Sequence, residues 1–188
     1  STLLASSAAS DVYKRQGRIF MLTIRFAKKE DVERIADIEL ECFPVAEAAD
    51  RETLKIRFEA FSENFLVAEK DGKVVGFING CTTNTPELPD ELYHNTKLHK
   101  PNGDYQTVFG LDVVPEYRKQ GIAEELLKKL IGLSIERGKK GVVLTCKDHL
   151  VHYYSKFGFK HLGISASSHG GAKWNDMYLS LIHISEPT

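Results

Sequence analysis

A strand, a helix and a second strand follow one another between residues 106 and 146, and this succession constrains the fold more than any other feature. Residues 106–114 form an apolar run, and residues 141–146 form another, GVVLTC. A strand–helix–strand crossover is right-handed and joins parallel strands, so we expect an α/β domain in which these two strands are parallel. Between them, residues 119–137 place apolar side chains at helical spacing, at Ile122, Leu126, Leu127, Leu130, Ile131 and Leu133.

The rest of the chain alternates between strand and helix patterns, with one long polar interruption. Residues 65–69 and 74–82 flank an Asp71-Gly72 turn and predict a β-hairpin. Residues 83–104 are polar and rich in proline, and a loop of this length inside a compact domain is usually functional or mobile. Strand patterns also occupy residues 22–26, 159–165 and 173–181, and helix patterns occupy residues 32–43, 50–61 and 148–157.

The two ends of the chain differ in character from its middle. Of the 188 residues, the first 20 include no methionine, and their apolar stretch is broken by serines. Met21 directly precedes the first strand pattern. We therefore expect one domain at residues 21–181, with residues 1–20 and 182–188 as non-native tails.

The net charge and the cysteine content limit which binding partners and which cellular compartment we expect. The formal net charge of −1 argues against a generic electrostatic grip on nucleic acid or on an anionic membrane. No apolar run approaches the ~20 residues that span a bilayer. The three cysteines, Cys42, Cys81 and Cys146, are far apart and form no Cys-x-x-Cys, so we expect free thiols in a cytoplasmic protein.

The junction between the strand 106–114 and the following helix is the clearest candidate for a binding site. Residues 113–123 read VVPEYRKQGIA, and we expect the helix to begin near Lys119. The first amides of a helix have no intrahelical partner and lie at the positive end of its dipole, so they suit an anion. Arg118 and Lys119 add positive charge. The pattern is neither a P-loop nor a Rossmann fingerprint, and an ordinary basic strand-to-helix turn is the competing interpretation.

This junction resembles the acetyl-CoA-binding motif of the GNAT superfamily of N-acetyltransferases. The motif Arg/Gln-x-x-Gly-x-Gly/Ala stands here as Arg118-x-x-Gly121-x-Ala123, directly after Val-x-Pro-Glu-Tyr. The order of elements over residues 22–181 is also similar to the superfamily, and residues 144–159 resemble its arylalkylamine N-acetyltransferase branch. The resemblance implies an α/β (α+β) GNAT fold. This fold is a mixed, mostly antiparallel, twisted sheet of seven strands flanked by about four helices, with a V-shaped splay between the fourth and fifth strands.

The resemblance also implies which residues bind acetyl-CoA as a cosubstrate. The pantetheine arm is expected at the backbone of Leu111, Asp112 and Val113. Tyr154 matches the family tyrosine that protonates the departing thiolate, and packing on the core beside Tyr153 is the alternative. The pyrophosphate is expected at Arg118 and at the amides that open the helix, those of Lys119, Gln120, Gly121, Ile122, Ala123 and Glu124.

The general base is where the sequence departs from this branch. An alkylamine arrives protonated, since its pKa is near that of lysine, about 10.4, so a base or a water chain must remove a proton. The branch carries two histidines where this chain has Thr107 and Phe109. No histidine pair has the i, i+4 spacing of a helical metal site, so no metal is expected. Candidate replacements for the base are a water chain, Asp112 and three residues of the long loop, Glu87, His94 and His99, each of which is otherwise a solvated surface group.

We expect direct acetyl transfer from acetyl-CoA to a small primary amine, by a monomer or a homodimer. The acceptor is expected among residues 43–58, 83–104 and 165–174. Acetylation of a protein N-terminus or lysine is a second possibility, and it would need an open groove. A non-catalytic acyl-CoA-binding regulator is a third; the missing histidines permit it, whereas Tyr154 and the intact turn oppose it.

Overall fold

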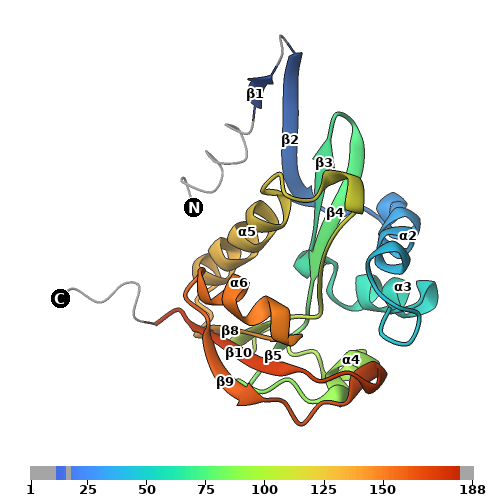
Figure 1. Cartoon of the computed structure of the whole chain (residues 1–188). Coiled ribbons are helices and arrows are strands. Elements are labelled where there is room, and N and C mark those ends of the chain that lie inside the picture. Colours follow the sequence, from blue (N-terminus) through green and yellow to red (C-terminus); the bar gives the residue numbers. More distant parts are fainter. Residues whose placement is uncertain (1–11, 16–17, 183–188) are drawn as a thin grey trace, which may run out of the picture. The chain divides into compact units, whose positions relative to one another are not determined.

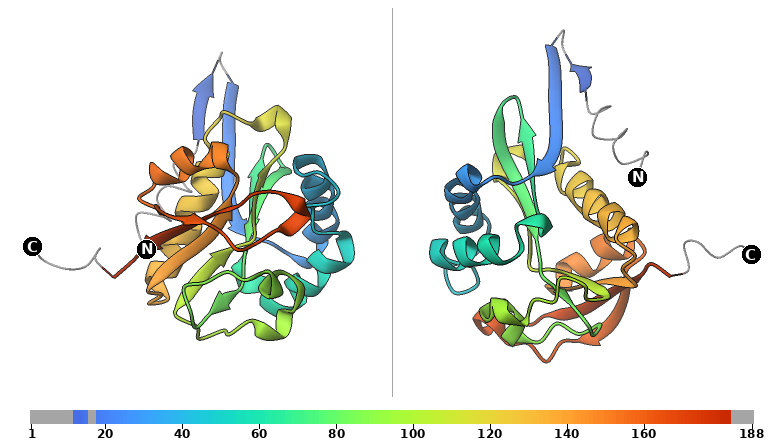
Figure 2. Two further views of the ribbon diagram at one scale, coloured as in Figure 1. Left: turned by 60° about the horizontal axis from the view of Figure 1, so that its bottom comes forward. Right: turned by 180° about the vertical axis from the view of Figure 1, so that it is seen from behind.

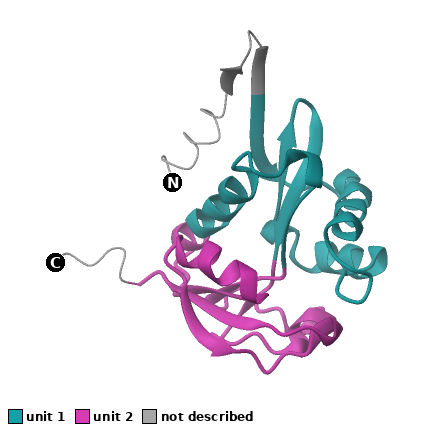
Figure 3. Ribbon diagram, in the orientation of Figure 1, with its two compact units in different colours: residues 1–79, 110–133 teal, residues 80–109, 134–188 magenta. Residues whose placement is uncertain are grey.

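The computed structural model describes residues 12–15 and 18–182, which fall into two compact units (Figure 3). The first unit combines the residues up to 79 with residues 110–133. The second combines residues 80–109 with the residues from 134 onward. The three cysteines are free thiols. Among the described residues, no helix is both long enough and apolar enough to cross a bilayer.

The first unit is built on a five-stranded antiparallel sheet in the order β1-β2-β3-β4-β7. The helices α2 (Val32–Cys42) and α3 (Arg51–Phe61) lie on one side of this sheet, and residues 122–133 of α5 (Ile122–Glu136) lie on the other (Figure 1; Figure 2). The strands are β1 (Val12–Arg15), β2 (Arg18–Phe26), β3 (Phe65–Lys70), β4 (Lys73–Asn79) and β7 (Gly110–Val113).

Burial in the first unit follows the apolar spacing of the helices. In α5, the side chains of Ile122, Leu126, Leu127 and Leu130 are at most 2% exposed, which accounts for the stripe seen in the sequence. The helix α3 begins where Asp50 accepts the N–H of Thr53 at 2.8 Å, a normal N-terminal cap. These helices are therefore held by one apolar face each rather than by local propensity alone.

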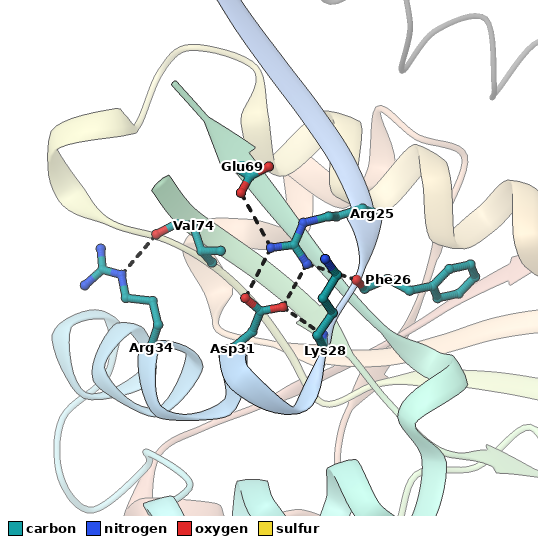
Figure 4. A network of polar contacts seen from close by, with 7 residues as sticks. All are labelled: Arg25, Phe26, Lys28, Asp31, Arg34, Glu69 and Val74. Atoms are coloured by element: carbon teal, nitrogen blue, oxygen red, sulfur yellow. Dashed lines mark hydrogen bonds and ion pairs between the residues drawn. The ribbon is translucent and has the colours of Figure 1, made fainter. Parts of the chain in front are cut away.

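An ion-pair network fastens the start of α2 to the sheet (Figure 4). Arg25 of β2 donates to both carboxylate oxygens of Asp31 at 2.8 and 3.2 Å, and its guanidinium lies 3.6 Å from Glu69 of β3. One turn into the helix, Arg34 Nε donates to the carbonyl of Val74 in β4 at 3.0 Å. The entry of α2 is thus tied by polar contacts to three neighbouring strands.

The second unit has its own five-stranded sheet, in the order β5-β6-β8-β10-β9. Only β6 and β8 are parallel; the other neighbours in this sheet are antiparallel. The short helix α6 (Val151–Ser155) contacts β9 and β10, and α4 (Asp90–His94) lies within the long loop. The strands are β5 (Thr82–Thr83), β6 (Tyr105–Val108), β8 (Gly141–Cys146), β9 (Lys160–Ile164) and β10 (Asn175–Ser180).

The parallel pair predicted from the crossover is confirmed, but the strand before the helix is divided. β6 pairs with β8 from Tyr105 opposite Gly141 to Val108 opposite Leu144. Its continuation, β7, pairs with β4 in the sheet of the first unit. The parallel pairing therefore ends at Val108, within the strand where the resemblance implies a splay.

Several element boundaries differ from the sequence-based expectations. Ten strands in two sheets are described in place of seven in one, partly because residues 106–114 form two strands and partly because β1 precedes the predicted domain. The fold is nevertheless the expected mixed α/β type. The long loop includes α4 and the 3-10 helix η3 (Thr96–Leu98). Of the predicted tails, residues 1–11, 16–17 and 183–188 lie outside the described part of the chain.

Candidate functional site

The junction after β7 makes two sharp backbone turns before the helix begins. Pro115–Tyr117 form the 3-10 helix η4, and α5 starts at Ile122, so the expected helix start near Lys119 was wrong. The physical reason is the backbone conformation: φ is 60° at Lys119 and 82° at Gly121, in the left-handed region that interrupts a right-handed helix. A Cβ on Gly121 would meet no heavy atom closer than 3.9 Å, so conformation rather than crowding favours glycine there.

The amides that open α5 are placed to bind an anion. Glu125 N donates to Gly121 O at 3.1 Å and closes the first turn. The preceding amides of Ile122, Ala123 and Glu124 therefore have no intrahelical acceptor and lie at the positive end of the helix dipole. The predicted binding residues of the junction thus stand together in one turn, with exposed Arg118 and Lys119 beside them. Two diphosphate oxygens suit such a turn.

Only some of the backbone groups predicted to bind the pantetheine arm point outward from the edge of the sheet at β7. Val114 N donates to Val75 O at 2.9 Å, and Asp112 lies opposite Phe77 in the same ladder. Because backbone groups alternate along an antiparallel strand, those of Asp112 face β4, whereas those of Leu111 and Val113 point away from it. The backbone of Asp112 is thereby used by the sheet, and Leu111 and Val113 are the residues with outward-facing groups.

The carbonyl of Val113 is already engaged by two side chains of the same unit. Arg118 Nε donates to it at 3.0 Å, and Cys42 Sγ, from the end of α2, donates at 3.4 Å. Arg118 therefore links the turn before α5 to the end of β7, and its guanidinium stabilises this turn as well as carrying positive charge.

Asp112 is a buried acid paired with a second acid. Its side chain is 1% exposed and that of Glu39 in α2 is 7% exposed. A Cβ on Gly110 would lie 3.1 Å from Asp112 Oδ1 and 3.5 Å from Glu39 Oε1, so both oxygens border the same glycine. Burial raises the pKa of Asp112 well above its usual range, and the charge and hydrogen bond of Glu39 add to the rise. Burial beside a second acid therefore disfavours the charged form of Asp112.

Tyr154, the predicted proton donor, belongs to α6 in the second unit. Its side chain is 7% exposed, and its ring makes edge contacts with Tyr153 at 5.2 Å and Phe159 at 5.8 Å between centroids. Tyr153 is more exposed and also contacts Phe157. The ring of Tyr154 therefore packs among aromatic side chains, which both the catalytic and the core hypotheses expect.

The two residues that stand where the branch carries histidines make structural contacts within the second unit. Thr107 is fully buried, and its hydroxyl donates to the carbonyl of Cys81 at 2.9 Å. The ring of Phe109 packs against Tyr93 with centroids 4.7 Å apart. Neither side chain can take a proton from an amine at neutral pH.

The loop candidates for the base have distinct positions in the second unit. His99 Nδ1 accepts the N–H of Thr82 at 3.1 Å, so this ring helps to fix the backbone of the loop. His94 is exposed and lies 6.1 Å from the ring of His169. Glu87 is exposed at a cavity described below. No group of three or more metal-ligating side chains occurs in the part of the chain that the structure describes.

Two of the three predicted acceptor segments meet in the second unit. Ser167 Oγ donates to Asp90 Oδ1 at 2.5 Å, and His169 stacks on Tyr93 with centroids 5.7 Å apart. The third segment, residues 43–58, belongs to the first unit, where Phe58 packs edge-on against Phe65. The expectation that this segment takes part in acceptor binding stays a prediction.

A cavity of about 350 Å³ lies where the loop segments meet. Three carboxylates line it, those of Glu87, Asp90 and Asp176, together with serines 165 and 167. The remaining lining is mainly apolar and comes from Pro86, Leu88, Pro89, Val143, Leu144, Leu162 and Ala166. Acidic groups around an apolar space suit a small organic cation. Sequence analysis had proposed Glu87 as a candidate base. It had given no indication of Asp176, which lies on β10 and reaches the cavity through the pairing of that strand.

The junction also includes a residue that sequence reasoning missed. Lys70, at the end of β3, is 5% exposed, and its ammonium donates to Gln120 Oε1 at 2.5 Å. It stood in the predicted hairpin turn, where a lysine is normally solvated, and only the fold brings it to the junction.

Residues 32–159 match the sequence model of the Acetyltransferase (GNAT) family. YkwB, an uncharacterized N-acetyltransferase of Bacillus subtilis, is 28% identical over 138 residues, covering 67% of this chain and 61% of that protein. The serotonin N-acetyltransferase of Mesocricetus auratus is 32% identical over 113 residues, covering 60% of this chain and 53% of that protein. The chain thus spans little more than half the length of these relatives. The loading GNATL domain of CurA from Lyngbya majuscula has the same fold, with a TM-score of 0.74 at 16% identity over 86% of this chain and 98% of that domain.

Proposed function

Since this chain belongs to the acetyltransferase (GNAT) family, we propose that it transfers an acetyl group from acetyl-CoA directly to a small primary amine of the arylalkylamine kind. The observation that carries the proposal is the turn at Arg118–Ile122, where two left-handed residues leave the first amides of α5 open to an anion. A pyrophosphate fits this turn in charge and in hydrogen-bond donors. Acetyl-CoA, when bound, supplies the acetyl group as an activated thioester.

The first unit provides the residues that hold the cosubstrate in this proposal. The amides of Ile122, Ala123 and Glu124 bind the pyrophosphate, with Arg118 and Lys119 supplying positive charge. The outward-facing backbone groups of the β7 edge bind the pantetheine amides as an added strand would. Val113 contributes its N–H, because its carbonyl is engaged by Arg118 and Cys42.

Proton transfer in this proposal uses water and Tyr154. Thr107 and Phe109 offer no base, and burial beside Glu39 disfavours the charged form of Asp112, so we propose that the ammonium of the acceptor loses its proton to water. Tyr154 then gives its hydroxyl proton to the departing sulfur. The buried, ring-lined position of Tyr154 supports this role, because a fixed phenol needs little reorganisation.

The acceptor is proposed to enter the cavity of the second unit. The carboxylates of Glu87, Asp90 and Asp176 attract an ammonium group, and the apolar walls accept an alkyl chain or a ring. The similarity to serotonin N-acetyltransferase supports an arylalkylamine, and the carboxylates also suit diamines.

A thiol-release assay with acetyl-CoA and a panel of amines tests the function. The panel includes phenylethylamine, tryptamine, a diamine and a short peptide with a free N-terminus. Turnover is expected with at least one small amine and not with the peptide. Preference for the peptide would replace the small-molecule acceptor with a protein acceptor. Coenzyme A binding without turnover on any amine would favour the acyl-CoA-binding regulator, which the absence of a base at residues 107 and 109 makes the second candidate.

A further inference from the structure

A β-hairpin brings a buried lysine to the cofactor turn. Lys70 is the last residue of β3 and lies opposite Lys73, the first residue of β4. Asp71 and Gly72, which join them, have φ values of 52° and 83°, the pair of left-handed residues that makes a tight two-residue hairpin turn. The two lysines thus share one hairpin but not one environment, since Lys70 is 5% exposed and Lys73 is exposed.

The ammonium of Lys70 makes specific contacts at this turn. Its Nζ donates to Gln120 Oε1 at 2.5 Å and lies 5.9 Å from the ring centroid of Tyr117. Gln120 stands between Lys119 and Gly121, the two residues in left-handed conformation. A hydrogen bond from a charged donor is stronger than a neutral one, and it is stronger still where water is scarce. The side chain of Gln120 is therefore anchored from outside the turn itself.

We propose that Lys70 is a positioning residue for acetyl-CoA: through Gln120 it holds residues 119–121 in the conformation that presents the α5 amides to the pyrophosphate. This inference rests on the proposed function. The left-handed conformation of Lys119 is unfavourable for a residue with a side chain, so the turn needs an external contact to persist. Lys70 supplies that contact, and its charge also favours an anion nearby.

The test compares Lys70→Met with Lys73→Met, which removes the same charge from the exposed side of the same hairpin. Two donors are used: acetyl-CoA, and S-acetylpantetheine, which carries the thioester but no phosphate. We expect Lys70→Met to raise the KM for acetyl-CoA about tenfold with kcat nearly unchanged, and to leave kcat/KM for S-acetylpantetheine as in the wild type. Lys73→Met is expected to match the wild type with both donors. A loss that affects both donors equally would indicate general damage to the fold and would overturn the inference.

A double-mutant cycle tests whether Lys70 acts through Gln120. Gln120→Leu removes the acceptor of the hydrogen bond at an exposed position, so it carries the same test if Lys70→Met does not fold. The single and double variants are expected to lose similar affinity for coenzyme A, because each breaks the same contact. Losses that multiply would overturn the proposed route through Gln120.

Titration of the wild type with coenzyme A separates this inference from the proposed function. A wild-type chain that does not bind coenzyme A overturns both. Wild-type binding that Lys70→Met retains at full strength overturns only the role of Lys70.

Discussion

The carboxyl groups of Glu39 in α2 and Asp112 in β7 face each other in the interior of the first unit, both close to Gly110. Glu39 Oε2 also accepts the N–H of Ala49 at 2.8 Å, so the pair connects the segment after α2 to β7. Burial and the neighbouring charge of Glu39 raise the pKa of Asp112. The pair is therefore a structural contact whose strength depends on pH.

Replacing Asp112 by asparagine is expected to stabilise the protein at neutral and alkaline pH. The folded-state pKa of Asp112 is raised above the unfolded value of about 3.9, so its contribution is fully present below that value and is lost as pH rises through the folded pKa. Glu39 and Cys42 raise this pKa, and Arg118 lowers it, after burial as the main cause. We expect the free energy of unfolding of Asp112→Asn to exceed that of the wild type by about 1 kcal/mol at pH 8. The variant should also lack the fall in stability that the wild type shows as pH rises.

Urea unfolding between pH 4 and pH 9 measures this difference, with Asp37→Asn as the control because Asp37 is an exposed acid of the same helix as Glu39. Equal pH slopes for the wild type and Asp112→Asn would contradict a raised pKa of Asp112.

Replacing Gly121 by alanine is expected to weaken coenzyme A binding. The φ of 82° disfavours any residue with a Cβ, although the space around it is open, so stability falls by about 1 kcal/mol and the turn shifts. Gly138→Ala is the matched control, since Gly138 has a φ of 72°, open surroundings and a place at the far end of α5. Calorimetric titration should show reduced affinity only for Gly121→Ala. Equal affinities in both variants would remove the turn from the binding site.

Replacing Tyr154 by phenylalanine is expected to lower kcat about a hundredfold without changing the affinity for acetyl-CoA, because only the proton donor is lost. Tyr153→Phe is the neighbouring control and should retain kcat. Steady-state kinetics with a saturating amine provide the measurement. An unchanged kcat in Tyr154→Phe would favour the alternative that this ring is a core residue.

Replacing Asp90 by asparagine is expected to raise the KM for a cationic amine about fivefold while the KM for acetyl-CoA stays constant. The reason is the loss of one of three carboxylates around the cavity of the second unit. Glu91→Gln is the control, because Glu91 is an exposed acid on the same short helix. Steady-state kinetics at two salt concentrations provide the measurement. Equal KM values for the amine in Asp90→Asn and Glu91→Gln would indicate that the acceptor binds outside this cavity.

The local patterns of the sequence predicted most of the elements, and long-range pairing explains the differences. Helical spacing identified α5, but its start shifted from Lys119 to Ile122 because backbone conformation at Lys119 and Gly121 is not encoded in apolar periodicity. The run 106–114 gave no sign of a division, because each half is buried in a different sheet and local residue types do not reveal which strand each half pairs with.

The candidate site was predictable to the extent that it lies in one stretch of chain. The motif Arg118-x-x-Gly121-x-Ala123 is local, so it could be recognised directly. Lys70 and Asp176 reach their sites only through hairpin and strand pairing, and no residue near them in sequence reveals those neighbours. Glu39 and Asp112 are likewise 73 positions apart in the sequence, so no local pattern reveals that they are neighbours.

The division of residues 105–113 between two sheets has a consequence for synthesis of the chain. The edge strand of the first unit, β7, emerges from the ribosome only after residues 80–109 of the second unit have already been made. The first unit cannot complete its sheet, or receive α5, before that point. All residues of the first unit have been made once Leu133 is added, whereas the second unit still lacks every residue from Ser134 onward. The first unit can therefore complete its sheet and receive α5 before the second unit is complete, although it can do neither before residues 80–109 have been made.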